Sequence, residues 1–137
     1  MTAQYFVDTN ILLYAGSGHP DDAGKRVVAL DILRRGDVGF SAQVMQEYYD
    51  VAYRKGRLGI SREEALSALR AIARRPVAPI NAELVLRAAV LADRFQISYW
   101  DAAIVAAALE LGCQTVYSED LNHQQNYDGV TVVNPFI

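Results

Sequence analysis

The stretch Tyr5-Phe6-Val7-Asp8-Thr9-Asn10, continued by Ile11-Leu12-Leu13-Tyr14-Ala15, decides how the rest of the chain can be arranged. Residues 3 to 7 form an apolar run typical of a β-strand, and a short helix is expected from Thr9 to Ala15. In an α/β chain, the carboxyl ends of the strands border the crevice in which ligands bind. Asp8 is therefore the first candidate functional carboxylate, although an aspartate at this kind of turn can also be only a helix N-cap.

The remaining residues alternate between short strands and helices, which predicts one α/β domain with a parallel sheet covered on both sides. We expect helices at about 21–35, 42–55, 61–74, 81–95 and 99–111, strands at 38–41, 114–117 and 130–133, a strand or extended connector at 76–80, and loops at 16–20 and 118–129. Helix caps are expected from Asp21 or Asp22, Asn81 and Ser98, and a capping box from Ser61 with Glu64.

Composition limits the class of protein. A chain of 137 residues with 52% hydrophobic and 21% charged residues predicts a single folded domain spanning 1–137. No stretch reaches the roughly 18 apolar residues of a membrane span, so we expect no membrane association. Cys113 is the only cysteine, which excludes an intramolecular disulfide and fits a reducing cytoplasm. We expect Cys113 to be a small buried residue and not a nucleophile.

The net charge of −3 argues mildly against nucleic-acid binding, which usually needs a basic surface. That objection weakens if several acids are clustered and neutralised by cations. Arg54, Lys55 and Arg57 form the clearest basic cluster, and two arginine pairs, 34–35 and 74–75, are further candidates. Each cluster can equally be a solvated helix end, because cations are favoured in the last turn of a helix.

Three further acids stand where folding alone does not ask for an acid. Glu47 shares the core-facing spacing of Val44, Tyr48 and Val51, so it lies either at the solvated edge of that stripe or in a polar pocket that binds cations. Asp101 is the one charged residue among apolar and aromatic neighbours from 99 to 109. It can also complete a capping box with Ser98, and the two roles are compatible.

Asp120 follows the strand expected at 114–117, in Ser118-Glu119-Asp120-Leu121-Asn122. It is the second acid at a strand end, although it can also belong to an ordinary polar loop. Glu119, beside it, is expected to face solvent.

Together, Asp8, Glu47, Asp101 and Asp120 indicate a metal site. Like charges brought together without compensation repel and raise one another's pKa. Divalent Mg²⁺ or Mn²⁺ resolves this, because these ions take carboxylate oxygens together with water and substrate phosphate. The only histidines, His19 and His123, stand in expected loops, so nothing near the acids indicates zinc.

At this point the residues resemble a known family. Val7-Asp8-Thr9-Asn10, the helical Glu47, Tyr99-Trp100-Asp101-Ala102, and Ser118-Glu119-Asp120-Leu121 leading to Val133-Asn134-Pro135-Phe136 look like a PIN-domain ribonuclease. Within that family the chain most resembles the VapC-type toxins of bacterial toxin–antitoxin pairs. The match runs from about Tyr5 to Phe136, and its specificity lies in the ordered set and not in any single motif.

The resemblance implies a three-layer PIN-like fold with a parallel sheet of four or five short strands between helices. It implies cleavage of RNA with one or two Mg²⁺ or Mn²⁺ ions, a homodimer, and a cognate antitoxin partner. The family's acidic quartet carries onto Asp8, Glu47, Asp101 and Asp120, which would be catalytic and would ligate the metal. Thr9, Asn10 and Ser118 would position water and metal ligands.

Two kinds of alternative remain. A receiver-type phosphoacceptor domain also carries acids at strand ends but needs a late lysine, and the only lysines are Lys25 and Lys55. A phosphatase of the Asp-x-Asp type is disfavoured because Asn10 occupies the place of the second acid. A PIN fold that binds RNA or protein without catalysis also remains open, although all four acids are present.

Overall fold

The computed structural model describes all of residues 1–137 and contains six α-helices and a six-stranded sheet. In chain order the elements are β1 (Tyr5–Val7), α1 (Thr9–Gly16), the 3₁₀ turn η1 (Pro20–Asp22), α2 (Ala23–Leu33), β2 (Val38–Ser41), α3 (Ala42–Ala52), the 3₁₀ turn η2 (Gly56–Leu58), α4 (Arg62–Ile72), β3 (Val77–Ala78), α5 (Ala82–Phe95), α6 (Tyr99–Glu110), β4 (Thr115–Tyr117), β5 (Asn126–Tyr127) and β6 (Val130–Val133). The expected α/β fold is confirmed.

The order of the strands decides where a ligand site can form. The strands lie in the order β3-β2-β1-β4-β6-β5, and every neighbouring pair is parallel except β5 with β6. From β1 the chain moves outward through β2 and β3, and it then returns to the other side of β1 with β4. The direction of winding therefore reverses between β1 and β4. In open α/β sheets, such a switch point is where ligands bind at the carboxyl ends of the strands.

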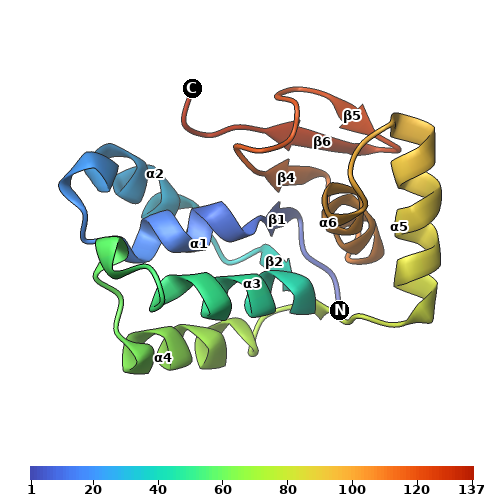
Figure 1. Ribbon diagram of the computed structural model, residues 1–137. Coiled ribbons are helices and arrows are strands. Elements are labelled where there is room, and N and C mark those ends of the chain that lie inside the picture. The colour runs from blue at the N-terminus through green and yellow to red at the C-terminus, as the bar shows by residue number, and fades with distance from the viewer.

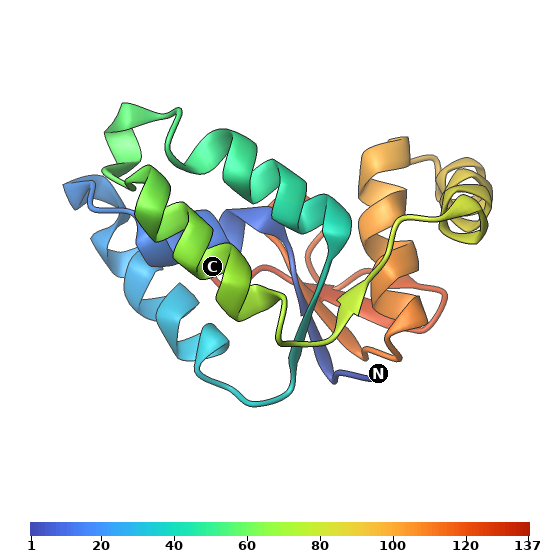
Figure 2. The same cartoon turned by 90° about the horizontal axis from the view of Figure 1, so that it is seen from below.

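Helices lie on both sides of the sheet. Figures 1 and 2 show α1 to α4 gathered on one side and α5 with α6 on the other. Helix α6 packs on β2, β3, β4 and β6, and α5 packs on α6. Residues 102–108 of α6 are all buried, as the unbroken apolar run of that helix predicts. No helix reaches the length and apolarity that a membrane crossing requires.

The start of α2 differs from the prediction. Neither Asp21 nor Asp22 caps this helix with its side chain. The ring of His19 accepts a hydrogen bond from the backbone N–H of Asp21 and so caps η1, and α2 begins only after that turn. Asp22 is 5% exposed, because its carboxylate turns inward and accepts hydrogen bonds from Ser17 and Arg57. The caps by Asn81 and Ser98 and the Ser61–Glu64 capping box are confirmed.

The segment predicted as one loop from 118 to 129 also contains a strand. β5 pairs with β6 in an antiparallel hairpin, which adds a sixth strand at the edge of the sheet. The hairpin turns at Asp128 and Gly129, whose φ angles are 57° and 107°. Positive φ at both central residues matches the twist of a two-residue hairpin, and Asp-Gly is a favoured pair there. Helix α3 ends at Ala52, a few residues earlier than predicted.

Candidate functional site

Asp8 lies at the carboxyl end of the central strand and at the start of α1. Its carboxylate accepts a hydrogen bond from the backbone N–H of Thr9, at 2.7 Å, so the predicted N-cap is present. The second carboxylate oxygen accepts a hydrogen bond from the hydroxyl of Ser118, at 2.8 Å. Because Val7 pairs with Tyr117 in parallel register, Asp8 and Ser118 leave neighbouring strands at the same level. Asp8 is only 6% exposed, so this carboxylate is held in a fixed, largely dry position.

The loop after β4 brings Asp120 to the same place. The hydroxyl of Ser118 that donates to Asp8 also accepts a hydrogen bond from the backbone N–H of Asp120, at 3.1 Å. The side-chain amide of Asn10 donates to the Asp120 carboxylate, at 3.1 Å. Asp8 and Asp120 are thus joined through Ser118 on one side and through the first turn of α1 on the other. Asp120 itself is exposed, so it can reach a ligand arriving from solvent.

Glu47 reaches the site from α3. Val44 and Tyr48 are buried in the core as predicted, whereas Glu47 is half-buried. Its carboxylate accepts a hydrogen bond from the hydroxyl of Thr9, at 2.8 Å, and another from the side chain of Gln43, at 2.9 Å. Glu47 therefore lies among polar side chains and not at a freely solvated edge, and the binding of a cation there stays a prediction.

Asp101 enters from the first turn of α6. Its backbone N–H donates to the hydroxyl of Ser98, at 3.1 Å, which is the N-cap arm of the predicted capping box. The side chain of Gln43, which holds Glu47, also donates to the backbone carbonyl of Trp100, at 3.3 Å. Gln43 thereby ties α3 to the start of α6 and fixes Glu47 relative to Asp101.

Gln43 was not predicted as part of the site. The signal in the sequence was its place four residues before Glu47, on the same helix face. The structure adds that this polar side chain is only 7% exposed.

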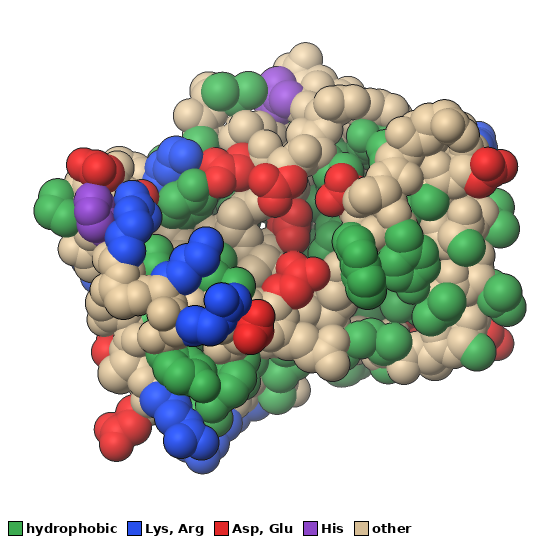
Figure 3. All heavy atoms as spheres, in the orientation of Figure 1, with side chains coloured by type: hydrophobic (Ala, Val, Ile, Leu, Met, Phe, Trp, Pro, Cys, Tyr) green, Lys and Arg blue, Asp and Glu red, His purple; other side chains and the backbone are tan.

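Two of the four acids, Asp8 and Asp101, have a raised pKa, and burial is the main cause in both. Burial raises the pKa of Asp8 to about 6, and the charges of Asp120 and Glu47 add to this, while the hydrogen bonds from Ser118 and Thr9 oppose it. Burial also raises the pKa of Asp101, again with added repulsion from Asp120 and Glu47. Figure 3 shows Asp and Glu side chains across the middle of one face of the molecule, with Lys and Arg side chains beside them.

The donor chemistry of this site fits a hard divalent cation. All the side-chain groups that converge are oxygen donors or hold one in place, and the Oδ1 atom of Asn10 is buried without a hydrogen-bond partner. No three His, Cys, Asp or Glu side chains lie close enough together to ligate one ion directly. An ion here would therefore be held by one or two of these carboxylates and otherwise by water, which is how Mg²⁺ is typically bound.

Zinc is not indicated. His19 and His123 each accept a hydrogen bond from a backbone N–H, and burial raises the pKa of the Cys113 thiol to about 12.

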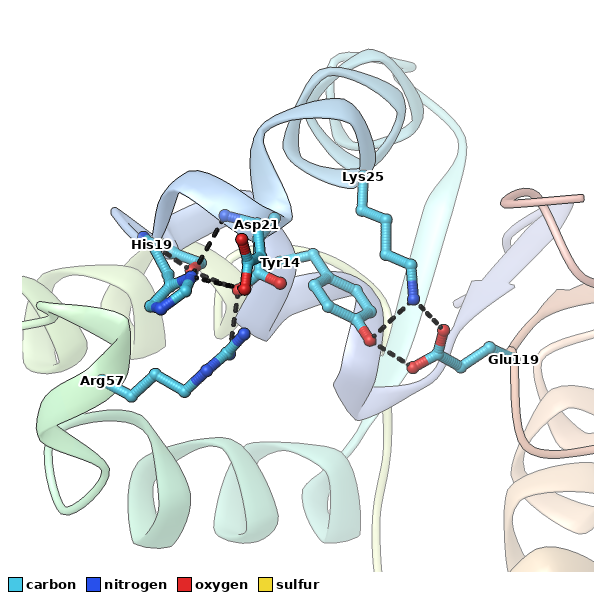
Figure 4. Close-up of polar contacts among 8 residues, drawn as sticks. Tyr14, His19, Asp21, Lys25, Arg57 and Glu119 are labelled. Carbon is cyan, nitrogen blue, oxygen red and sulfur yellow. Dashed lines mark hydrogen bonds and ion pairs between the residues drawn. The ribbon is translucent and has the colours of Figure 1, made fainter.

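The prediction that Glu119 faces solvent is wrong. Its carboxylate accepts hydrogen bonds from the hydroxyl of Tyr14, at 2.5 Å, and from the ammonium of Lys25, at 3.0 Å (Figure 4). The Lys25 ammonium also lies 4.6 Å from the centre of the Tyr14 ring. This triad links α1 and α2 to the loop that carries Ser118 and Asp120. No local pattern indicates this triad, since Lys25 and Glu119 are 94 residues apart.

Comparisons with solved structures find the same fold in other proteins. VapC20 of Mycobacterium tuberculosis, a sarcin–ricin loop cleaving toxin, superposes with a TM-score of 0.66 and 24% identity over 85% of this chain and 90% of that one. A toxin–antitoxin complex from Klebsiella pneumoniae superposes with a TM-score of 0.69 and 19% identity, over 96% of this chain and 98% of that one. FitAcB from Neisseria gonorrhoeae superposes with a TM-score of 0.66 and 22% identity, over 97% of this chain and 99% of that one.

These structures share the fold of the present chain at low sequence identity, and no curated protein sequence matches it. The family model of the PIN domain, however, matches residues 5–129. That range includes β1, β4 and all four acids at the switch point between them. The chain therefore belongs to the PIN domain family.

Proposed function

We propose that this chain is a divalent-metal-dependent endoribonuclease and the toxin of a VapC-type toxin–antitoxin pair. The observation that carries the proposal is the placement of four carboxylates around the switch point of the sheet, three of them held by hydrogen bonds from Thr9, Asn10 and Ser118. Membership in the PIN family and a similar fold in a toxin described as cleaving the sarcin–ricin loop support RNA as the substrate.

The chain's own residues would divide the work as follows. A bound Mg²⁺ or Mn²⁺ would supply Lewis acidity and neutralise charge on the phosphodiester. Asp8 and Asp101 would hold this ion, and Glu47 and Asp120 would complete the site or hold a second ion. Thr9 fixes the orientation of the Glu47 carboxylate through a 2.8 Å hydrogen bond. Ser118 and Asn10 do the same for Asp8 and Asp120. Such supporting hydrogen bonds orient metal ligands before the substrate arrives.

We also propose an antitoxin partner and a homodimer in the cytoplasm, where the RNA substrate is found. Several structures with this fold are complexes of a toxin with its antitoxin. The present chain offers an apolar groove of about 400 Å³ along α3 and α4, lined mainly by Met45, Tyr49, Tyr53 and Leu69. Tyr53 is exposed and the other three are partly buried, and aromatic residues and Met are enriched in protein interfaces.

The test is cleavage of a mixed RNA pool by the purified protein with Mg²⁺, with Mn²⁺ and with chelator, wild type beside Asp8→Asn. We expect cleavage that needs the metal and falls by at least a hundredfold in the variant, because the amide removes a charge and not the shape. Asp128→Asn, at an exposed site in the β5–β6 turn, is the matched control and should cleave normally. Cleavage by Asp8→Asn at the wild-type rate would contradict the assignment. Metal binding without cleavage of any RNA would support a binding module instead.

A further inference from the structure

We propose that a cleft beside the four carboxylates, lined by Lys55 and Arg57, binds a phosphate of the RNA strand next to the phosphodiester that is cleaved. This inference rests on the proposed function and assigns the substrate backbone a second point of attachment. It also divides the clearest basic cluster of the sequence: Lys55 and Arg57 would face the substrate, and Arg54 would not.

The cleft has a volume of about 220 Å³ and adjoins the acidic site. Helix α1 contributes Asn10 and Leu13, the segment around η2 contributes Lys55 and Arg57, and the loop after β4 contributes Glu119. Asn10 belongs to both places, because its amide donates to Asp120 while the same residue lines the cleft. A strand whose reacting phosphate lies at the carboxylates can therefore continue directly into this cleft.

The charges in the cleft leave one cation uncompensated. Glu119 is paired with Lys25 at 3.0 Å, and the buried Asp22 is paired with Arg57 at 3.2 Å. Figure 4 shows Arg57 on one side of Tyr14 and the Lys25–Glu119 pair on the other. Arg57 uses one guanidinium nitrogen for Asp22 and is half-exposed, so it retains further N–H donors. The exposed ammonium of Lys55 makes no ion pair within the chain.

The other basic residues are less suited to this role. Arg54, directly before Lys55, turns back along its own helix and pairs with Asp50 at 3.1 Å. Arg94 pairs with Asp128 at 3.0 Å on the other side of the molecule's sheet. Neither of these arginines lines the cleft that borders Asn10. Lys55 is thus the cation best placed to attract a phosphate near the acids.

The ligand expected here is a nucleic-acid strand and not a small free anion. A small anion at Lys55 would be repelled by the nearby acids with nothing to hold it. A polymer anchored at the carboxylates through a cation brings its next phosphate to Lys55 at little further cost in entropy. Leu13 and Leu58 add apolar surface on which a ribose or base can rest.

The test compares RNA binding with all four carboxylates intact. The wild type and its variants are titrated with a fluorescein-labelled 12-nucleotide RNA at salt concentrations from 50 to 300 mM, with Ca²⁺ in place of Mg²⁺ because it also takes carboxylate oxygens. Gel electrophoresis verifies that the RNA stays intact during the titration. Lys55→Gln is the test variant, and Arg54→Gln is the matched control, since it removes the same charge from the adjacent residue. Arg57 is left intact, because its removal would strand the buried Asp22. Thermal unfolding verifies that both variants are folded.

We expect Lys55→Gln to weaken binding about fivefold at 0.1 M salt and to reduce the slope of log K against log salt by about 0.7, the value for one phosphate contact in single strands. Arg54→Gln should change the slope by much less. In otherwise wild-type protein, Lys55→Gln should raise KM and leave kcat nearly unchanged.

Equal slopes for Lys55→Gln and its parent, with RNA still bound, would overturn the cleft and leave the proposed nuclease standing. The absence of both RNA binding and cleavage in the wild type would overturn the two together.

Discussion

Replacing Asp8 by Asn should stabilise the metal-free protein at neutral pH, although Asp8 lies at the heart of the candidate site. Burial raises the pKa of this carboxyl from its ordinary value of 3.8 to about 6 in the folded chain. The folded state therefore binds the proton more tightly than the unfolded state. Below pH 3.8 both states are protonated and stability is complete. As pH rises toward 6 the unfolded chain ionises first, so stability falls, and the loss is complete above 6.

The size of the effect follows from the same values. Each unit of pKa corresponds to about 1.4 kcal/mol, so the ionised Asp8 lowers the free energy of unfolding by about 3 kcal/mol at neutral pH. About 2 kcal/mol of this should develop between pH 4.5 and pH 7.5. An asparagine does not titrate and still caps α1, and it loses about 1 kcal/mol through the weakened Ser118 hydrogen bond. The variant should gain a net stability of about 2 kcal/mol at pH 7.5.

The assay is urea unfolding in chelator at pH 4.5 and 7.5, read as the difference between Asp8→Asn and wild type so that other titrations cancel. Asp22→Asn is the matched control of opposite sign. Hydrogen bonds from Ser17 and Arg57 hold the pKa of Asp22 below its ordinary value, so its ionised form stabilises the fold and removing it should cost more as pH rises. A difference for Asp8→Asn that stays constant with pH, or follows that of Asp22→Asn, would refute the reasoning.

Two further outcomes follow from the contacts around the acids. Thr9→Val keeps the shape of the side chain but removes the hydroxyl that donates to Glu47 at 2.8 Å, so the affinity for Mg²⁺ should fall about 10- to 100-fold. The stabilisation by Mg²⁺ in thermal unfolding measures this affinity, and Thr115→Val on β4 is the control. Glu119→Gln weakens a partly exposed ion pair with Lys25, so the free energy of unfolding should change by less than about 1 kcal/mol. The loop that carries Ser118 should nevertheless exchange its amide hydrogens faster. Unchanged exchange in that loop would show that the triad does not hold it.

The sequence was sufficient for the parts of the fold that depend on local signals. The strand ending at Asp8, the caps by Ser61, Asn81 and Ser98, and the apolar helix after Ser98 all follow from short-range patterns. The Asp128-Gly129 turn was equally local and was missed, although Asp-Gly before an apolar run indicates a hairpin.

Other features could not be read locally. Lys25 reaches Glu119 only because α2 folds back over α1, and the pair is separated by 94 residues. Asp22 is a residue type that favours helix caps, but its carboxylate accepts hydrogen bonds from Ser17 and Arg57 instead. Helix α2 therefore has no side-chain cap, and His19 caps the preceding turn η1. In both cases the charged side chain binds a partner that only the tertiary fold brings close to it.

The site at the switch point links folding to ligand binding. Asp8 and the loop that carries Asp120 lie side by side because β1 and β4 end at the same level, and the buried Asp8 is then ionised at neutral pH at a cost of about 3 kcal/mol. The hydrogen bonds from Ser118 and Thr9 offset only part of this cost, since the pKa remains raised. A divalent cation would offset the remainder, because it favours the ionised form that burial opposes. Mg²⁺ should therefore stabilise the wild type against unfolding most at neutral pH and progressively less toward pH 5, even without RNA. If Mg²⁺ stabilises Asp8→Asn as much as the wild type, the ion binds elsewhere.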